Sequence, residues 1–201
     1  MVKPSPPTDI NSFLSAIGHV CLQWALLEQT LLAIIASAED SSFDKVYTRF
    51  GGLDMLKRLN MAVALTREAK WPNRLTKPLV NIRRAIQRDG EGLAEQRNMF
   101  VHGVHKETDV PGEISLTMSR GSAAKRHQIV TLLDAVQLST RLAELVQEAD
   151  GVFRDYGTWK FGVKDHAERR YNVAETKTLS RFIRTQNIKR AIKLLFANLK
   201  P

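Results

Sequence analysis

The sequence predicts an all-α fold, namely a bundle of four to six helices with a small β-hairpin insert and a basic helical C-terminal extension. Apolar residues recur at steps of three and four along most of the chain up to Tyr156, which is the period of a helix with one buried face. The period changes to two at residues 114–118, where apolar and polar side chains alternate as in a half-buried strand. With 201 residues, 43% of them hydrophobic, the chain is long enough to bury one sizeable core.

Two helical patterns fill the N-terminal third of the chain. The first extends to Ile34, and Thr8 or Asp9 can act as its N-cap. The second covers residues 43–63, and the Gly51-Gly52 pair within it predicts a kink. Both helices are expected to bury one apolar face in the bundle.

In the middle of the chain, the pattern of residues predicts helices followed by a hairpin. The second helix should end near Trp71-Pro72, because proline disfavours a helical conformation in the residue before it. Residues 75–100 keep a helical step through the loop-like segment 89–92, so they form either one interrupted helix or two helices placed end to end. Residues 108–113 are typical of a turn, and the alternating residues 114–118 after it predict the β-hairpin.

The C-terminal part combines a last bundle helix with a basic extension. Thr131 is expected to cap a helix over residues 132–156. We therefore divide the chain into a disordered N-terminus (1–8), a helical domain (9–157) and a basic extension (158–201). From Trp159 onward there are 11 lysines and arginines and 3 acidic residues, so this segment carries +8 of the net charge of +9. Such an excess attracts phosphate backbones, although basic tails are often only solvated. The candidate phosphate-binding residues in the extension are Arg181, Arg184, Lys189, Arg190 and Lys193.

Composition argues against several classes of protein. Cys21 is the single cysteine, so no internal disulfide can form, and the Cys and His residues are too few and too scattered to predict a zinc site. We expect no metal and no cofactor. The first seven residues contain no apolar run typical of a signal peptide, and no stretch was expected to supply the roughly 18 apolar residues of a membrane span. These features predict a cytoplasmic protein without a membrane partner.

An arginine interrupts the apolar face of the third helical pattern. Continuing that face from Ile86 by steps of four and three predicts apolar residues at 90, 93, 97 and 100, yet position 97 is an arginine. A guanidinium is costly to bury alone, so Arg97 should meet an anion, a carboxylate or the edge of an interface. A structural ion pair with Glu28 or Glu95 is the simplest alternative to a functional role.

Two neighbours of Arg97 strengthen the functional interpretation. Asn98 and His102 are four residues apart, so a helix places them on one face, and the long Arg97 side chain can reach that face. Gly103 follows His102 as a helix-ending residue does. A permanent cation, an amide and an imidazole are the groups needed to cleave RNA without a metal. Taken alone, His102 would be interpreted as a histidine at a helix end that bonds a backbone carbonyl.

The segment Arg97-Asn98-Met99-Phe100-Val101-His102-Gly103 resembles the Arg-x4-6-His motif of the HEPN superfamily, the higher eukaryotes and prokaryotes nucleotide-binding domain. The early helix adds Trp24-Ala25-Leu26-Leu27-Glu28, which is similar to the Trp-x-x-x-Glu pattern of many small bacterial HEPN-like proteins. The resemblance covers roughly residues 10–156. The basic segment after Trp159 has no counterpart in the minimal family pattern.

The resemblance implies a helical bundle that forms a homodimer, with both motifs facing a shared cleft. Many members are metal-independent endoribonucleases that act as toxins of toxin-antitoxin pairs or in phage defence. In that case Arg97 would bind the scissile phosphate, His102 would act as general base or acid, and Asn98 would orient them. The products would be a 2′,3′-cyclic phosphate and a new 5′ end, and the partners would be RNA and possibly an antitoxin protein.

Alternatives remain for the function and for the residues around the motif. His105 and Lys106 can extend a phosphate-binding rim, and a solvated hairpin strand explains them equally well. Glu28 shares a helix face with Trp24 and can pair with Arg97 without being catalytic. The alternative function is a non-catalytic HEPN-like module that binds nucleic acid or protein. A third alternative is a purely structural interaction protein.

Overall fold

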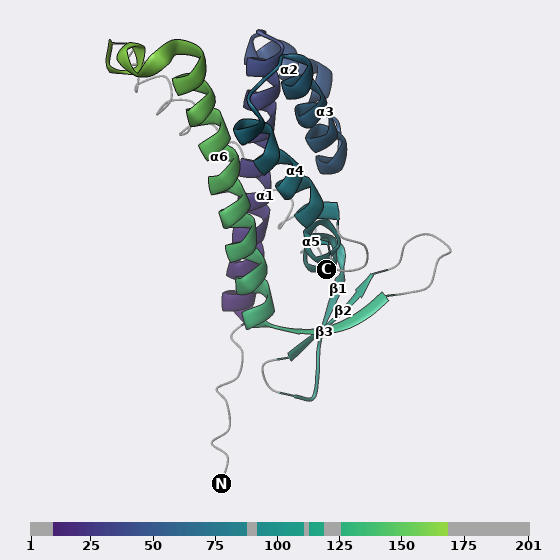
Figure 1. The fold of residues 1–201 in the computed structure, drawn as a ribbon. Coiled ribbons are helices and arrows are strands. Elements are labelled where there is room, and N and C mark those ends of the chain that lie inside the picture. Colours follow the sequence, from purple (N-terminus) through teal and green to yellow (C-terminus); the bar gives the residue numbers. More distant parts are fainter. Residues whose placement is uncertain (1–9, 88–91, 111–112, 119–125, 169–201) are drawn as a thin grey trace. The chain divides into compact units, whose positions relative to one another are not determined.

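The computed structural model describes residues 10–87, 92–110, 113–118 and 126–168, which are mostly helical with one small antiparallel sheet (Figure 1). This agrees with the predicted all-α class with a small hairpin insert. The predicted disordered segment 1–8 and the basic residues after 168 lie outside the described residues. The helices are α1 (Ile10–Ala38), α2 (Phe43–Phe50), α3 (Met55–Glu68), α4 (Asn73–Gln87), α5 (Leu93–His102) and α6 (Leu132–Glu168). The strands are β1 (Val104–Glu107), β2 (Glu113–Met118) and β3 (Arg126–Thr131).

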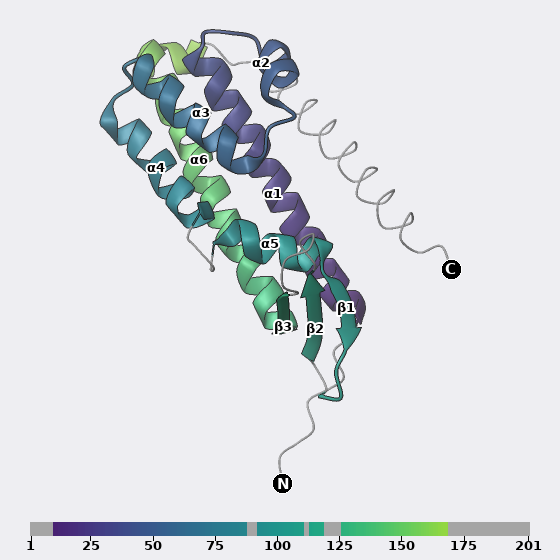
Figure 2. The ribbon, with the colours of Figure 1, turned by 90° about the vertical axis from the view of Figure 1, so that its right-hand side faces the viewer.

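The core is built around the long helix α1. It packs against α2, α3 and α5, and α4 packs against α3 and α5 (Figure 2). Most of the apolar side chains that recur along α1 are inaccessible to solvent, as the sequence period predicts, although Leu14 is exposed. The fully buried residues of this face are Phe13, Val20, Leu27, Leu31 and Ile34.

The Gly51-Gly52 pair ends a helix instead of kinking one, so that prediction was wrong. α2 stops at Phe50, and α3 starts after Asp54, whose side chain accepts a hydrogen bond from the Lys57 amide at 2.9 Å. A Cβ at Gly51 would lie 2.5 Å from the Tyr47 carbonyl oxygen, so a glycine suits this turn. Because Asp54 supplies a new N-cap, the chain begins a separate helix here.

The predicted hairpin is part of a three-stranded antiparallel sheet with the strand order β1-β2-β3. β1 and β2 form the expected hairpin, with Lys106 opposite Ser115. The sequence analysis missed β3, which pairs with β2 and places Thr117 opposite His127. In β2 the inward side chains Ile114, Leu116 and Met118 are buried, in agreement with the alternating pattern.

The last helix begins where the sequence predicts and ends later. Thr131 and Asp134 form a reciprocal cap: the Asp134 amide donates to Thr131 Oγ1 at 3.3 Å, and the Thr131 amide donates to Asp134 Oδ2 at 2.7 Å. α6 then runs to Glu168, beyond the Gly157 at which a change was expected. The chain divides into two compact units, Met1–Phe153 and Arg154–Pro201.

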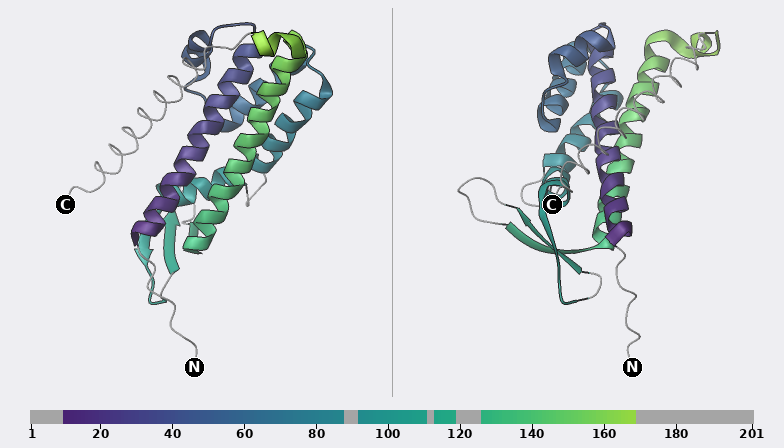
Figure 3. Two further views of the ribbon diagram at one scale, coloured as in Figure 1. Left: turned by 90° about the vertical axis from the view of Figure 1, so that its left-hand side faces the viewer. Right: turned by 180° about the vertical axis from the view of Figure 1, so that it is seen from behind.

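Within the first unit, α6 lies beside α1 (Figure 3). Thr30 of α1 donates a hydrogen bond to Asp150 of α6 at 2.9 Å, and the two side chains join the helices at the surface. The α6 residues that face inward form a buried stripe with helical spacing. Its members are Ala135, Leu138, Leu142, Val146, Ala149 and Val152.

The segment Asn11–Ala38 of α1 is long and apolar enough to cross a membrane by length and composition, contrary to the expectation that no stretch is. This is weak evidence, because the core helix of a soluble protein passes the same test. The buried face of α1 packs on the other helices of the bundle, which fits a core helix.

Candidate functional site

Arg97 lies on α5 with its guanidinium partly buried. Its Cζ is 5.3 Å from the centre of the Trp24 ring, so the cation rests on an aromatic face of α1. Its Nε is buried and has no hydrogen-bond partner among the described residues. Within the same part of the chain, no carboxylate lies within ion-pair distance of Arg97. The charge of this arginine is therefore held in place by an aromatic ring and lacks a counter-ion there.

The structure brings together the three residues that the sequence selected. Arg97 Nη1 donates to Asn98 Oδ1 at 3.1 Å and contacts His102 Nε2 at 3.0 Å. Because a guanidinium can only donate, His102 Nε2 accepts and the ring proton resides on Nδ1. The side chain of Arg97 therefore bends toward the face shared by Asn98 and His102, as its length allows.

His102 is the last residue of α5, and its side chain is exposed. Gly103 follows in an extended conformation, and its amide donates to the Met99 carbonyl at 2.9 Å. A Cβ at Gly103 would lie 2.4 Å from the same carbonyl oxygen, so close approach is the reason for a glycine here. The turn at Gly103 leads directly into β1.

Both acids proposed as partners of Arg97 pair with other residues. Glu28 Oε1 is 3.0 Å from Arg58 Nη1, and it also accepts a hydrogen bond from Trp24 Nε1 at 3.2 Å. Glu95 pairs with Arg126 of β3. The alternative interpretation of Arg97, an ion pair with Glu28 or Glu95, is therefore not what the structure shows, because each acid pairs with another arginine.

Arg58 is a residue that the sequence analysis missed. Only 5% of it is exposed, and its Nη2 and Nε donate to the carbonyls of Gly51 and Phe50 at 2.6 Å and 3.3 Å. The sequence does contain a signal for Arg58. This charged residue stands three positions after the buried Met55 and one before the buried Leu59. Trp24 thus lies between two arginines, with its ring face on Arg97 and its indole N–H on the acid that pairs with Arg58.

The electrostatics of the cluster favour a neutral imidazole. Partial burial, and secondarily the neighbouring Arg97 charge, lowers the pKa of His102 below its ordinary value. The imidazole is therefore ready to accept a proton at neutral pH.

Burial raises the pKa of Cys21, and the charge of Arg97 opposes this shift only in part, so the thiol stays protonated. Cys21 is half-buried.

Two large apolar side chains, one on α1 and one just after α5, are exposed. Leu14 is 42% exposed and, with Ile17, shares the α1 face of Cys21 by helical spacing. Val104, two residues after His102, is 70% exposed.

The other predicted residues have separate positions. His105 lies edge-on to Phe13 with ring centres 5.9 Å apart, and its Nε2 donates to the Phe100 carbonyl at 3.0 Å, so this histidine connects β1 to the bundle. Lys106 is exposed on the opposite side of the strand. The residues proposed in the extension, from Arg181 to Lys193, lie outside the described residues.

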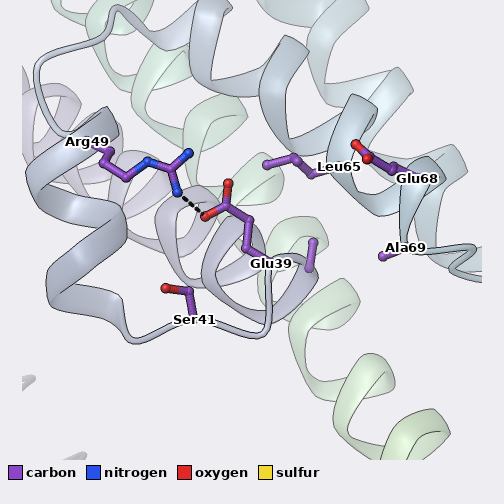
Figure 4. A pocket seen from close by; sticks show the side chains of 7 residues that line it. Glu39, Ser41, Arg49, Leu65, Glu68 and Ala69 are labelled. Atoms are coloured by element: carbon purple, nitrogen blue, oxygen red, sulfur yellow. Dashed lines mark hydrogen bonds and ion pairs between the residues drawn. The ribbon is translucent and has the colours of Figure 1, made fainter.

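Two cavities lie apart from the cluster. One of about 440 Å³ is lined by α1, α2 and α3, and its Glu39 and Arg49 pair with each other at 2.8 Å (Figure 4). The other, about 720 Å³, lies between α4, α5, β3 and α6. Neither is lined by Arg97, Asn98 or His102.

The described residues contain no group of three or more His, Cys, Asp or Glu side chains that could hold a metal ion. The arrangement consists instead of a fixed cation, an amide and a neutral imidazole on one helix end. No family model, curated protein or solved structure matches this chain. The chemistry of the cluster is therefore the main evidence for a function.

Proposed function

We propose that this protein is a metal-independent endoribonuclease of the HEPN type. The observation that carries the proposal is the contact at 3.0 Å between His102 Nε2 and an arginine that has no carboxylate partner in the described part of the chain. A partly buried guanidinium without a counter-ion favours a phosphate, and the adjacent imidazole, whose pKa is lowered, is neutral and able to accept a proton at neutral pH. The resemblance of the Arg97–His102 segment to the HEPN motif supports the same conclusion.

In the proposed reaction, His102 removes the proton of a ribose 2′-hydroxyl. The oxygen attacks the adjacent phosphorus, the O2′–P bond forms and the P–O5′ bond breaks. Nε2 is covered by Arg97 in the free protein. A phosphate that binds the Arg97 fork competes for Nη1 and so uncovers the Nε2 lone pair. Substrate binding and activation of the base are thereby coupled through one guanidinium.

The remaining residues complete the proposed mechanism. Arg97 stabilises the negative charge that develops on the phosphorane, and Asn98 holds the arginine through its amide oxygen. The leaving 5′-oxygen needs a proton from a second acid. We propose that the protonated imidazole of a second copy supplies it across a homodimer interface formed at the exposed apolar residues Leu14 and Val104, and that the charge of the bound phosphate favours this protonated form in one of the two copies. The products are a 2′,3′-cyclic phosphate and a 5′-hydroxyl.

Cleavage of RNA by purified protein in the presence of EDTA tests the proposal. Wild-type protein should cleave, and His102→Ala should lose activity by at least 10²-fold, the usual contribution of a general base. His127→Ala is the matched control, because this histidine is exposed on β3 and should be dispensable. Cleavage that persists in His102→Ala would refute the assignment.

The alternative function, a binding module without cleavage, gives a different result in the same assay. It predicts RNA binding that weakens steeply with salt and no product in any variant.

Sedimentation of the wild type and of Leu14→Glu tests the proposed dimer. The introduced charge should dissociate the dimer and, at the same time, reduce cleavage.

The cellular role belongs to the same proposal. We infer a cytoplasmic protein that acts as a growth-arresting or defence toxin, with an antitoxin protein as a possible partner. Induced expression in growing bacteria should arrest growth for the wild type and spare it for His102→Ala. Equal arrest by both proteins would rule out a toxic nuclease activity.

A further inference from the structure

The basic charge of the described helices is concentrated on one hairpin. Residues 55–87, which comprise α3, α4 and their connection, contain eight lysines and arginines and one acidic residue, Glu68. The rest of the chain up to Thr158 contains 11 basic and 17 acidic residues. The near-neutral average of the first 158 residues therefore conceals a strongly basic hairpin.

The exposed basic residues of α4 lie on one side of that helix. On α4, Arg74, Lys77 and Arg84 are exposed, and helical spacing places them within an arc of about 80°. They extend over about 15 Å, roughly the rise of four nucleotides in one strand of a duplex. On α3, Arg67 is likewise exposed, and Lys70 lies in the connection between the helices. These five residues define what we call the α3–α4 basic face; Arg83, about 180° from Arg74 around α4, lies on the side that meets α3.

Arg83 connects the two helices of the basic face. Its Nη1 donates to Asn60 Oδ1 of α3 at 3.4 Å. Its Nε is buried without a hydrogen-bond partner among the described residues. The described residues of the chain place no carboxylate within ion-pair distance of Arg67, Arg74, Lys77, Arg83 or Arg84. The positive charges of the basic face thus have no acidic partner in this part of the protein.

The chemistry of the basic face favours a phosphate backbone over a protein or a lipid. None of the exposed large apolar side chains belongs to residues 55–87. Protein interfaces depend on buried aromatic or aliphatic anchors, and membrane-surface helices depend on apolar side chains that enter the lipid. Arginine forks without apolar or aromatic neighbours instead bind phosphate oxygens and do not read bases.

We infer that the α3–α4 basic face holds the phosphate backbone of the RNA substrate outside the catalytic cluster, an inference that rests on the proposed nuclease function. The bound strand is contacted through phosphates, so the face contributes affinity without sequence preference. α4 contacts α5, which carries Arg97 and His102, so a strand on α4 borders the catalytic helix. RNAs longer than the few nucleotides that the cluster itself contacts should therefore bind more tightly than short ones.

Binding of a fluorescein-labelled single-stranded RNA to the full chain tests this inference, with His102→Ala as the background so that no cleavage interferes. The variant Arg74→Gln/Lys77→Gln/Arg84→Gln should bind roughly tenfold to 100-fold more weakly at about 0.1 M salt. Its salt dependence should be less steep by about 2 units, because each lost contact to single-stranded RNA removes about 0.7.

The matched control is Lys45→Gln/Arg141→Gln/Arg154→Gln, which also removes three positive charges, but from exposed positions outside the basic face. Its affinity for RNA, and the dependence of that affinity on salt concentration, should be nearly the same as those of the His102→Ala protein. Equal weakening by both triple variants, or no weakening by the α3–α4 variant, would overturn the inference. Labelled poly-glutamate that binds as tightly as RNA and depends on the same three residues would also overturn it, in favour of an acidic protein.

Cleavage assays separate this inference from the proposed function. In the His102 wild-type background, the α3–α4 variant should cleave a long RNA more slowly through a raised KM and should cleave a dinucleotide at the wild-type rate. If the wild type binds RNA through the basic face and cleaves neither substrate, the nuclease proposal fails and the binding surface stands. Slower dinucleotide cleavage by the folded variant would place the basic face in the catalytic machinery and contradict the inference.

Discussion

Two arginines beside the same tryptophan have opposite environments. Arg58 is almost completely buried and has an acid and two backbone carbonyls as partners. Arg97 is more exposed and contacts the Trp24 ring, Asn98 and His102, with no acid among the described residues. The first cation is neutralised within the fold, whereas the second is held in place and left without a counter-ion.

This difference separates a structural arginine from the one that we propose is functional. A buried charge requires compensation, and Glu28 provides it for Arg58. Because Glu28 is occupied there, it does not neutralise Arg97, and the second guanidinium is available to an external anion. The ion pair of the core thereby keeps the candidate site positively charged.

Replacing Arg97 should have the largest effect, and it should act on activity. Arg97→Ala removes the phosphate-binding cation and should reduce RNA cleavage about 10²- to 10³-fold, as loss of a transition-state donor does. The free energy of unfolding should change by less than about 1 kcal/mol, because no ion pair is broken. Cleavage rates and urea denaturation of the same preparation measure both quantities. A strongly destabilised but active variant would reverse the roles assigned to the two arginines.

Replacing Arg58 should act on stability. Arg58→Met leaves Glu28 and the carbonyls of Phe50 and Gly51 without their donor, and should lower the free energy of unfolding by about 3 kcal/mol. Urea denaturation measures the loss. Lys57→Met is the matched control: this neighbouring lysine is exposed, and its change should cost less than about 1 kcal/mol. Equal stability of the two variants would show that the buried pair is not structural.

Trp24 contacts Arg97 through its ring and contacts Glu28, the partner of Arg58, through its indole N–H. A conservative substitution can remove one of these contacts and keep the other. Trp24→Phe keeps an aromatic face for Arg97 and removes the indole donor to Glu28, which should cost about 1 kcal/mol of stability. Cleavage should be retained in Trp24→Phe and reduced in Trp24→Leu, which offers no ring to the guanidinium. Equal activity of the two variants would argue against a positioning role for the ring.

The smallest expected effect is a shift in the pH profile. The pKa of His102 is lowered by burial and by Arg97, so the protonated form, which cannot act as the base, should predominate only below the ordinary histidine range, and the acidic limb of the pH profile should follow that lowered pKa. Arg97→Gln removes the neighbouring charge, so the pKa of His102 should rise. NMR titration of the imidazole measures both values. A lower pKa in Arg97→Gln would contradict the electrostatic coupling.

Much of the fold follows from short-range patterns in the sequence. The periods of α1, α4, α5 and the first part of α6 identify helices, and the Thr131 cap and the β1–β2 hairpin were also predicted correctly. The break after Phe50 was missed because a glycine pair is compatible with a kink as well as with a turn. β3 was missed because its first four residues are exposed and show no alternation.

The sequence by itself determined the proximity of Arg97, Asn98 and His102, since the geometry of one helix fixes which side chains share a face. Only the tertiary structure decided that Glu28 pairs with Arg58, that Trp24 supports Arg97 and that Arg83 of α4 bonds Asn60 of α3. The physical reason is distance along the chain. Contacts within one helical turn depend on local backbone geometry, whereas the choice among several acids for one arginine depends on how whole helices pack.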